Sequence, residues 1–193
     1  MMELLYPIDT APVIGEKSSI NEMLPVVDRA GVVYAQSART NCHNPEKPLL
    51  HPVVHLEIVD RFSRFYLQRR SANKEKYPLR WDIAVGGHVT YGESFEEALY
   101  RESWEELKFS KFNPQFLVNY TTEEPGDDEM VNLYVAVGTY ALTPDNYEVC
   151  DGRYWTIEEI EASLGKEVFT PEFEIEFSEY REKILAVSYT HLT

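Results

Sequence analysis

The feature that most constrains this chain is the acidic stretch Gly87–Phe109, GHVTYGESFEEALYRESWEELKF. It holds six glutamates, at positions 93, 96, 97, 102, 105 and 106, and only one arginine and one lysine. Ser94 and Glu97 have the spacing of a capping box, in which each side chain bonds the backbone amide of the other residue. This signal predicts a helix from about Phe95 to about Leu107.

Three carboxylates of this helix point to one side. Glu102, Glu105 and Glu106 stand at i, i+3 and i+4, so they project from one face within a single turn. Grouped anions destabilise a helix unless a cation lies among them. A solvated acidic face is the ordinary alternative, but oxygen ligands packed this closely suit a hard divalent ion such as Mg²⁺ or Mn²⁺. The spacing therefore favours a divalent-metal site.

The whole stretch resembles the Nudix box, G-x5-E-x7-R-E-U-x-E-E-x-G-U, where U is a bulky aliphatic residue. The positions that fall in register are Gly87, Glu93, Arg101, Glu102, Glu105 and Glu106, with Phe109 at the last apolar position. Two positions depart, because Ser103 replaces an aliphatic residue and Lys108 replaces a glycine. The glycine takes a left-handed C-cap without steric cost, whereas a lysine there costs roughly 1 kcal/mol. We expect both departures to affect local stability more than chemistry.

The resemblance implies an activity and a set of site residues. Nudix hydrolases use Mg²⁺ or Mn²⁺ to cleave a diphosphate linkage between a nucleoside diphosphate and another group. The implied metal ligands are Gly87, through its carbonyl, and Glu102, Glu105 and Glu106. The implied catalytic residues are Glu93, Arg101, Glu102, Glu105 and Glu106. Arg101 is expected to face away from the ligand row and to pair with Glu93, which fixes the loop that enters the helix.

The general base varies in this family and often comes from a carboxylate on a later loop. The turn expected over Glu123–Glu129 offers five acids, Glu123, Glu124, Asp127, Asp128 and Glu129. The alternatives are that one of them reaches the site or that all belong to a solvated loop.

Three histidines suggest a second metal site. His43, His51 and His88 are spaced much as in type I isopentenyl-diphosphate isomerases, which share the Nudix fold. The resemblance implies that these three and Glu129 hold a divalent metal, and neutral imidazole suits Zn²⁺ or Mn²⁺. His55, four residues after His51, either joins this site or is simply packed.

The isomerase activity itself fits less well than hydrolysis. The isomerases use a catalytic cysteine just before the Gly-His pair, where this chain has Gly86, and Cys42 and Cys150 lie elsewhere. The isomerases also have a degenerate box, whereas this chain keeps every metal carboxylate. A non-catalytic nucleotide-binding module is the third alternative, although such modules usually lose box glutamates.

A basic segment interrupts the acidic chain. Its candidate phosphate-binding residues are Arg69, Arg70, Lys74 and Arg80, and the alternative is ordinary surface solvation. The formal net charge of −15 argues against binding to nucleic-acid polymers or anionic membranes. The expected partner is therefore a small-molecule diphosphate bound through cations. Many Nudix proteins are dimers, so a homodimer is a candidate assembly.

The remaining signals concern location and architecture. Two cysteines far apart, no signal peptide and no 18-residue apolar stretch predict a cytoplasmic protein. We expect an N-terminal extension over residues 1–22, one Nudix domain over 23–185 and an irregular tail over 186–193. The expected strands, numbered by residue, are 24–28, 32–36, 51–59, 65–70, 81–89, 115–122, 130–141 and 147–155, with a loop over Ser37–Leu49.

Two further helices complete the prediction. Thr156 is positioned to cap a short helix that ends at about Leu164, and Thr170 precedes a proline suited to a first helical turn. An apolar stripe in that last helix consists of Phe173, Phe177, Tyr180 and Ile184. Strands on both sides of a central helix predict an α/β fold, an α/β/α sandwich around a mixed β-sheet. Nudix proteins have that fold.

Overall fold

The computed structural model of the protein describes residues 22–124 and 127–190. Within these residues the chain forms nine strands and four helices: β1 (Met23–Val27), β2 (Val33–Ala38), α1 (Arg39–Cys42), β3 (His51–Val59), β4 (Phe65–Arg70), β5 (Trp81–Asp82), β6 (Val85–His88), α2 (Phe95–Leu107), β7 (Gln115–Glu124), β8 (Asp127–Val137), β9 (Val149–Trp155), α3 (Ile157–Glu161) and α4 (Pro171–Thr190). The expected N-terminal extension lies outside the described residues except for Glu22. Among the described helices, none combines the length and the hydropathy that crossing a bilayer requires.

A mixed seven-stranded sheet forms the body of the molecule. Its main strand order is β5-β4-β3-β8-β7, with β6 also paired to β3 and β9 to β4. β3 and β8 run parallel, and the other pairs of this sheet are antiparallel. The predicted α/β class with a central mixed sheet is therefore confirmed. The parallel pair places His51 opposite Glu129, although the two lie far apart in the sequence.

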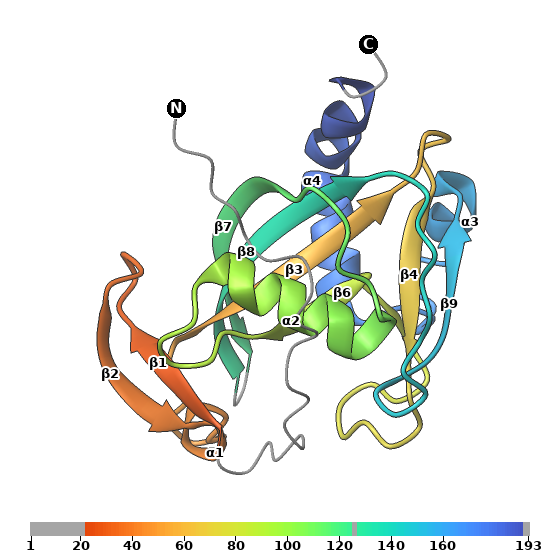
Figure 1. Cartoon of the computed structure of the whole chain (residues 1–193). Helices are drawn as coiled ribbons and strands as arrows, with labels where there is room; N and C mark the ends of the chain where they lie inside the picture. The colour runs from red at the N-terminus through yellow and green to blue at the C-terminus, as the bar shows by residue number, and fades with distance from the viewer. Residues whose placement is uncertain (1–21, 125–126, 191–193) are drawn as a thin grey trace, which may run out of the picture.

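Helices cover both faces of this sheet, and Figure 1 shows α2 in front of it and α4 behind. Successive residues of a strand point to opposite faces, so β3 supplies both cores. Leu56 and Ile58 belong to the cluster that contains Leu99 of α2. Val59 belongs to the cluster that contains Phe173 of α4. The sheet is thus enclosed between two helical layers.

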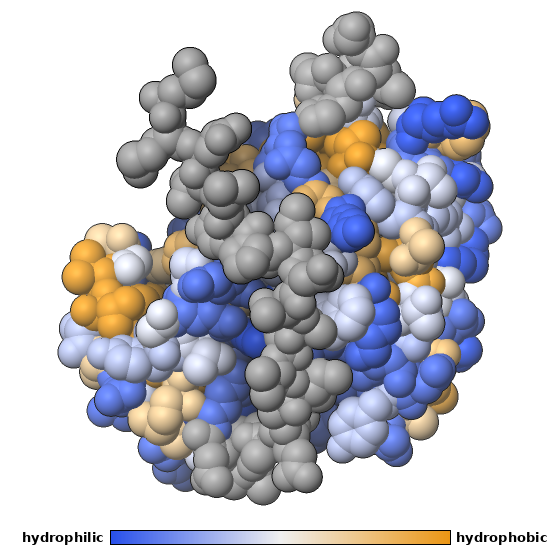
Figure 2. Space-filling view, viewed as in Figure 1, coloured by the Kyte–Doolittle hydropathy of each residue, from blue (hydrophilic) through white to orange (hydrophobic). Residues whose placement is uncertain are grey.

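The N-terminal hairpin is the predicted one. β1 and β2 pair antiparallel, with Met23 opposite Ala38, and form a separate two-stranded sheet. α1 lies inside the segment expected to be a loop. The hairpin projects from the body (Figure 1), and Figure 2 shows apolar surface at its tip, where Val32 and Val33 are more than half exposed.

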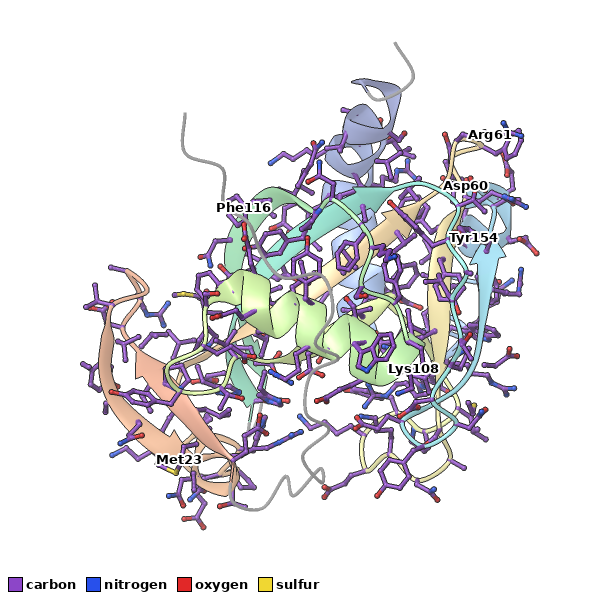
Figure 3. The ribbon with its side chains drawn as sticks, in the orientation of Figure 1. Met23, Asp60, Arg61, Lys108, Phe116 and Tyr154 are labelled. Atoms are coloured by element: carbon purple, nitrogen blue, oxygen red, sulfur yellow. The ribbon has the colours of Figure 1, made fainter. Side chains whose placement is uncertain are left out.

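Helix α2 begins and ends where the capping signals place it. The Ser94 hydroxyl accepts from the amide of Glu97, and the Glu97 carboxylate accepts from the amide of Ser94 at 2.8 Å. At the other end Lys108, labelled in Figure 3, takes left-handed angles of φ 54° and ψ 40°. The lysine therefore occupies the strained position that a glycine holds in the Nudix box.

Helix α4 is longer than expected. Phe173, Phe177 and Ile184 are at most 1% exposed and Tyr180 is partly buried against the same cluster, so three of the four positions of the predicted stripe are fully buried. Burying each phenylalanine contributes roughly 1.5–3 kcal/mol. The helix continues to Thr190, so the expectation of an irregular tail from residue 186 is wrong for residues 186–190, and 191–193 lie outside the described residues. The apolar spacing is lost in these residues, so the sequence did not indicate that the helix continues through them.

Other differences concern strand ends. The strand expected over residues 81–89 is divided into β5 and β6, and the one expected over 130–141 runs from Asp127 to Val137. The acidic turn expected over Glu123–Glu129 is mostly strand, because β7 ends at Glu124 and β8 begins at Asp127. Two of its acids, Asp127 and Glu129, are consequently buried.

Candidate active site

The start of α2 is fixed to the end of β6 by one arginine. Arg101 donates to both carboxylate oxygens of Glu93 at 2.8 Å, which confirms the predicted pair. It also donates to the carbonyl of His88 at 2.9 Å. The expectation that Arg101 faces away from the ligand row is wrong, because its Nη1 lies 2.6 Å from Glu102 Oε1 and 3.8 Å from Glu105 Oε2. Arg101 thus holds both the entering loop and the first carboxylate of the row.

Glu102 lies directly on the glycine that precedes the helix. A Cβ added to Gly87 would be 2.1 Å from the Glu102 carboxyl carbon, so only a glycine leaves room for this carboxylate. Glu106 is 3% exposed and accepts from Gln68 Nε2 at 3.1 Å and from the amide of Gly86 at 3.4 Å. Carboxylates packed against a glycine backbone are oxygen donors of the kind that a hard divalent ion prefers.

The three histidines expected to share a site lie close together. Among the described residues, two groups of three side chains have candidate ligand atoms within 4.8 Å of one another. The groups are His43, His51 and His88, and His51, Asp127 and Glu129. Glu102, Glu105 and Glu106 form no such group within the described part of the chain. We call the five residues of the two groups the histidine–carboxylate cluster. Of them, Asp127 alone was not among the predicted ligands, although its place two residues before Glu129 on a strand puts both on one face.

The ring nitrogens of the three histidines lie close to one another and to the carboxylates of the cluster. His51 Nδ1 lies 2.8 Å from the carbonyl of Leu49, which can only accept, so this nitrogen carries the proton. His51 Nε2 is buried without a hydrogen-bond partner among the described residues and lies 4.0 Å from Glu129 Oε1. His43 Nε2 and His88 Nε2 lie 2.9 Å apart. A backbone carbonyl that fixes the tautomer in this way is typical of metal-binding histidines.

Electrostatics keep two of these rings neutral. Burial lowers the pKa of His51 to about 4, and the neighbouring His43 and Arg39 act in the same direction. Burial, with Arg39 next, also holds the pKa of His88 well below its usual range. Burial, with Asp127 next, raises the pKa of Glu129. Neutral imidazoles are the form that binds metal ions.

Asp127 is the ionised member of the cluster. Burial raises its pKa, but His43 and Lys76 outweigh this and lower it to about 2. His43 Nδ1 lies 2.7 Å from Asp127 Oδ1, and Lys76 donates to Oδ2 at 2.5 Å. The basic segment therefore reaches the cluster through Lys76, which lies between Lys74 and Arg80.

The four candidate phosphate-binding residues all have partners within the protein. Lys74 pairs with Glu148 and Arg80 with Glu167, while Arg70 pairs with Asp82. Arg69 donates to the carbonyl of Leu79 at 3.0 Å. Lys74 is nevertheless among the cations that lower the pKa of His88, so it lies near the cluster.

His55 belongs to a different buried contact. Its Nδ1 lies 2.5 Å from Oε1 of Glu176 on α4, and Tyr120 of β7 donates to the same oxygen. Burial lowers the pKa of His55, but the Glu176 carboxylate outweighs it and raises the pKa to about 10. The alternative that His55 is packed rather than part of the metal site is therefore favoured. No local signal in the sequence joins it to Glu176, because the contact depends on how α4 crosses the sheet.

With this geometry in view, the comparisons with known proteins identify the class. A family model described as NUDIX domain matches residues 49–173, and this chain belongs to the Nudix family. It is 31% identical over 160 residues to an uncharacterized Nudix hydrolase of Streptomyces coelicolor, covering 82% of this chain and 87% of that protein. It is 25% identical to an isopentenyl-diphosphate Delta-isomerase of Brevibacterium linens, over 74% of this chain and 81% of the relative.

The fold has matches among solved structures. The crystal structure of DR0079 from Deinococcus radiodurans has a TM-score of 0.69 and 23% sequence identity, covering 84% of this chain and 99% of that one. The family domain and the relatives named as hydrolases together support a hydrolase. Nudix hydrolases generally use divalent metal ions, and the carboxylates around Gly87 are chemically suited to them.

Proposed function

We propose that this hydrolase cleaves a diphosphate linkage in a nucleoside diphosphate joined to another group, or in a related organic diphosphate, with Mg²⁺ or Mn²⁺. The observation that carries the proposal is the packing of the Glu102 carboxylate onto the backbone of Gly87. Arg101 and Glu93 brace this arrangement from the side of the entering loop. The remaining ligands would be Glu105 and Glu106, on the same helical face.

The reaction consists of attack by a water oxygen on one phosphorus and loss of the bridging oxygen, with a proton leaving the water. A divalent ion held there would neutralise phosphate charge and orient the attacking water. The chain supplies Glu102, Glu105 and Glu106 to hold that ion, and Arg101 keeps Glu102 in place. Of the acids expected to offer a general base, Asp127 and Glu129 lie in the histidine–carboxylate cluster and Asp128 is half-buried. The side chains of Glu123 and Glu124 lie outside the described residues.

We also propose a second divalent-cation site at the histidine–carboxylate cluster. The convergence of three imidazoles and two carboxylates supports it, as does the unpartnered nitrogen of His51. Zn²⁺ or Mn²⁺ suits this donor set. If the two sites are independent, His51→Ala should lose the metal of the cluster on dialysis, whereas Glu105→Gln should lose only the metal held by the α2 carboxylates and keep that of the cluster.

An isopentenyl-diphosphate isomerase-like activity is the second candidate function. The similarity to the Brevibacterium linens isomerase and the histidine–carboxylate cluster favour it. Gly86 argues against it, because position 86 precedes the Gly-His pair and is where the isomerases use cysteine. Cys42 is buried with Leu24 and Val26, and Cys150 lies on β9 with its Sγ near the carbonyl of Arg70.

The test is product release from a panel of diphosphate compounds with Mg²⁺, with Mn²⁺ and with EDTA, including isopentenyl diphosphate. Glu105→Gln and Glu106→Gln should each reduce turnover by orders of magnitude, because each keeps its size and loses a ligand charge. Glu96→Gln, an exposed residue of the same helix, is the matched control and should keep full activity. Full activity of Glu106→Gln would refute the ligand assignment. Isomerisation without hydrolysis would favour the second candidate. Cytoplasmic location and a homodimer stay predictions.

A further inference from the structure

The three carboxylates of the α2 row are held in different ways. Glu102 Oε1 lies 2.6 Å from Nη1 of Arg101, a cation. Glu105 is partly exposed, and its Oε2 lies 3.8 Å from the same nitrogen. Glu106 is buried, and its Oε2 accepts from Nε2 of Gln68 at 3.1 Å. One carboxylate of the row therefore receives a hydrogen bond from the side chain of a sheet residue.

The side chain of Gln68 faces α2 because of the way the strands are arranged. β8 pairs with β3 along the whole of that strand, so β4 and β6 share the other edge of β3. Residues two apart on a strand point to the same side. Tyr66, two residues before Gln68, belongs to the core cluster that contains Leu99 of α2, and so does Val85 of β6. Gln68 is therefore on the face of the sheet that α2 covers (Figure 1).

Two donors fix the rotation of the Glu106 carboxylate. Gln68 Nε2 donates to Oε2, and the amide of Gly86 donates to the same oxygen at 3.4 Å. An ionised carboxylate can only accept hydrogen bonds, so the amide nitrogen of Gln68, and not its oxygen, faces it. The last torsion of a glutamate is broad and roughly two-fold, so an unrestrained carboxylate turns easily. Because both donors select one oxygen, they hold the group in one orientation.

The Gln68 side chain itself has little freedom to move. It is 4% exposed, and its backbone is paired on both sides, opposite Asp82 of β5 and Gly152 of β9. Buried side chains in a close-packed interior keep to one rotamer for most of the time. The sheet therefore sets the position of the amide group, and the helix brings Glu106 to it.

A neutral donor suits a carboxylate that must bind a cation. N–H groups favour the ionised form of a carboxylate, which is the form that metal ions bind. A lysine or arginine in place of Gln68 would also donate, but its charge would compete with the ion. Groups that hydrogen-bond to metal ligands orient them, and the loss of one typically costs roughly 10–100-fold in metal affinity or activity. The amide of Gln68 has the chemistry and the position of such a group.

We propose that Gln68 is a positioning residue of the α2 metal site and that it acts through Glu106. It fixes the orientation of this carboxylate in advance, so that a divalent ion does not have to order it on binding. The inference rests on the proposed hydrolase function, in which Glu106 is a metal ligand, and it extends that site from the helix to strand β4.

The first test is the dependence of hydrolysis on the Mn²⁺ concentration. Gln68→Met nearly keeps the size of the side chain and removes the donor, so the half-saturating Mn²⁺ concentration should rise about tenfold. The kcat at saturating Mn²⁺ should stay within about twofold, because excess ion fills the site again. Gln68→Asn, one methylene shorter, should show the same defect and replaces the methionine variant if that one does not fold. Gln68→His, whose Nε2–H has a similar reach, should recover most of the affinity.

Leu67→Met is the matched control. Leu67 precedes Gln68 on β4, is fully buried and belongs to the core cluster on the α4 side of the sheet. A volume-conserving change there disturbs packing but removes no donor from a carboxylate, so the half-saturating Mn²⁺ concentration should not change. A lower melting temperature of Gln68→Met with an unchanged half-saturating concentration would mean that Gln68 only completes the core, and would overturn the proposal.

A binding measurement separates this proposal from the hydrolase function. Mn²⁺ binding is followed by the EPR signal of the free ion in His51→Ala protein, because His51 is shared by both groups of the histidine–carboxylate cluster. Adding Gln68→Met should weaken the remaining binding about tenfold, and Gln68→His should restore it. If no diphosphate compound is hydrolysed but these changes occur, the positioning role stands and the proposed function fails. Hydrolysis by the unaltered protein, with equal Mn²⁺ affinity in all Gln68 variants, would leave the function intact and overturn the inference.

Discussion

Replacing Gly87 with alanine should displace a candidate metal ligand. The new Cβ would lie 2.1 Å from Cδ and 2.4 Å from Cγ of Glu102, so the glutamate must move as a whole. Glu102 is only 9% exposed and is held by Arg101 at 2.6 Å. Losing that charge-assisted contact should cost about 1.5–3 kcal/mol. For a domain of this size the melting temperature should fall by roughly 3–12 °C.

The neighbouring glycine provides a matched control. A Cβ on Gly86 would lie 3.1 Å from the terminal methyl of Ile83 and 3.5 Å from His55 Cδ2, contacts that small side-chain shifts relieve. Thermal unfolding and metal-dependent hydrolysis should therefore separate the two variants. Gly87→Ala should lose stability and most activity, and Gly86→Ala should stay near the unaltered protein in stability. Equal melting temperatures for the two would refute the steric argument.

Three further predictions concern stability. Lys108→Gly should raise the free energy of unfolding by about 0.5 kcal/mol, because the relief of left-handed strain exceeds the entropy gained by the unfolded chain. Urea unfolding measures this change, and Lys108→Ala, which removes the side chain but keeps the strain, is the control. Arg101→Lys should cost about 1–2 kcal/mol, since an ammonium cannot replace the two-point contact with Glu93, and calorimetry measures it. The raised pKa of His55, about 10, means that its stabilisation is complete below pH 6.5 and is lost as the pH rises towards 10. Urea unfolding across that range should show the decline, and Glu176→Gln should flatten it.

Local signals in the sequence were sufficient to predict α2 and its contacts. The capping box, the row of carboxylates and the Glu93–Arg101 pair all lie within one short stretch, where spacing along the chain fixes spacing in space. The direction of Arg101 was mispredicted because helical spacing does not decide which way a long side chain turns. In the structure it reaches Glu102 as well as Glu93.

The sequence could not place residues that meet through tertiary contacts. Asp127 looked like part of a turn, yet it opens a buried strand and lies beside His43. Glu176 looked like one of several helical glutamates, and only the packing of α4 against the sheet makes it the fully buried partner of His55. Such pairings depend on strand order and helix position, which periodicity does not encode.

The central position of β8 also has a consequence for the order of folding. β8 lies between β3 and β7, and its parallel pairing with β3 brings Glu129 opposite His51. Contacts between distant segments form slowly, because the intervening chain must be closed first. A growing chain that has not yet emerged as far as β8 therefore has the three histidines of the cluster but lacks both of its carboxylates, Asp127 and Glu129. A cation bound by the cluster would then stabilise only chains in which β8 is already paired in the sheet. Its binding would shift the equilibrium towards the folded state.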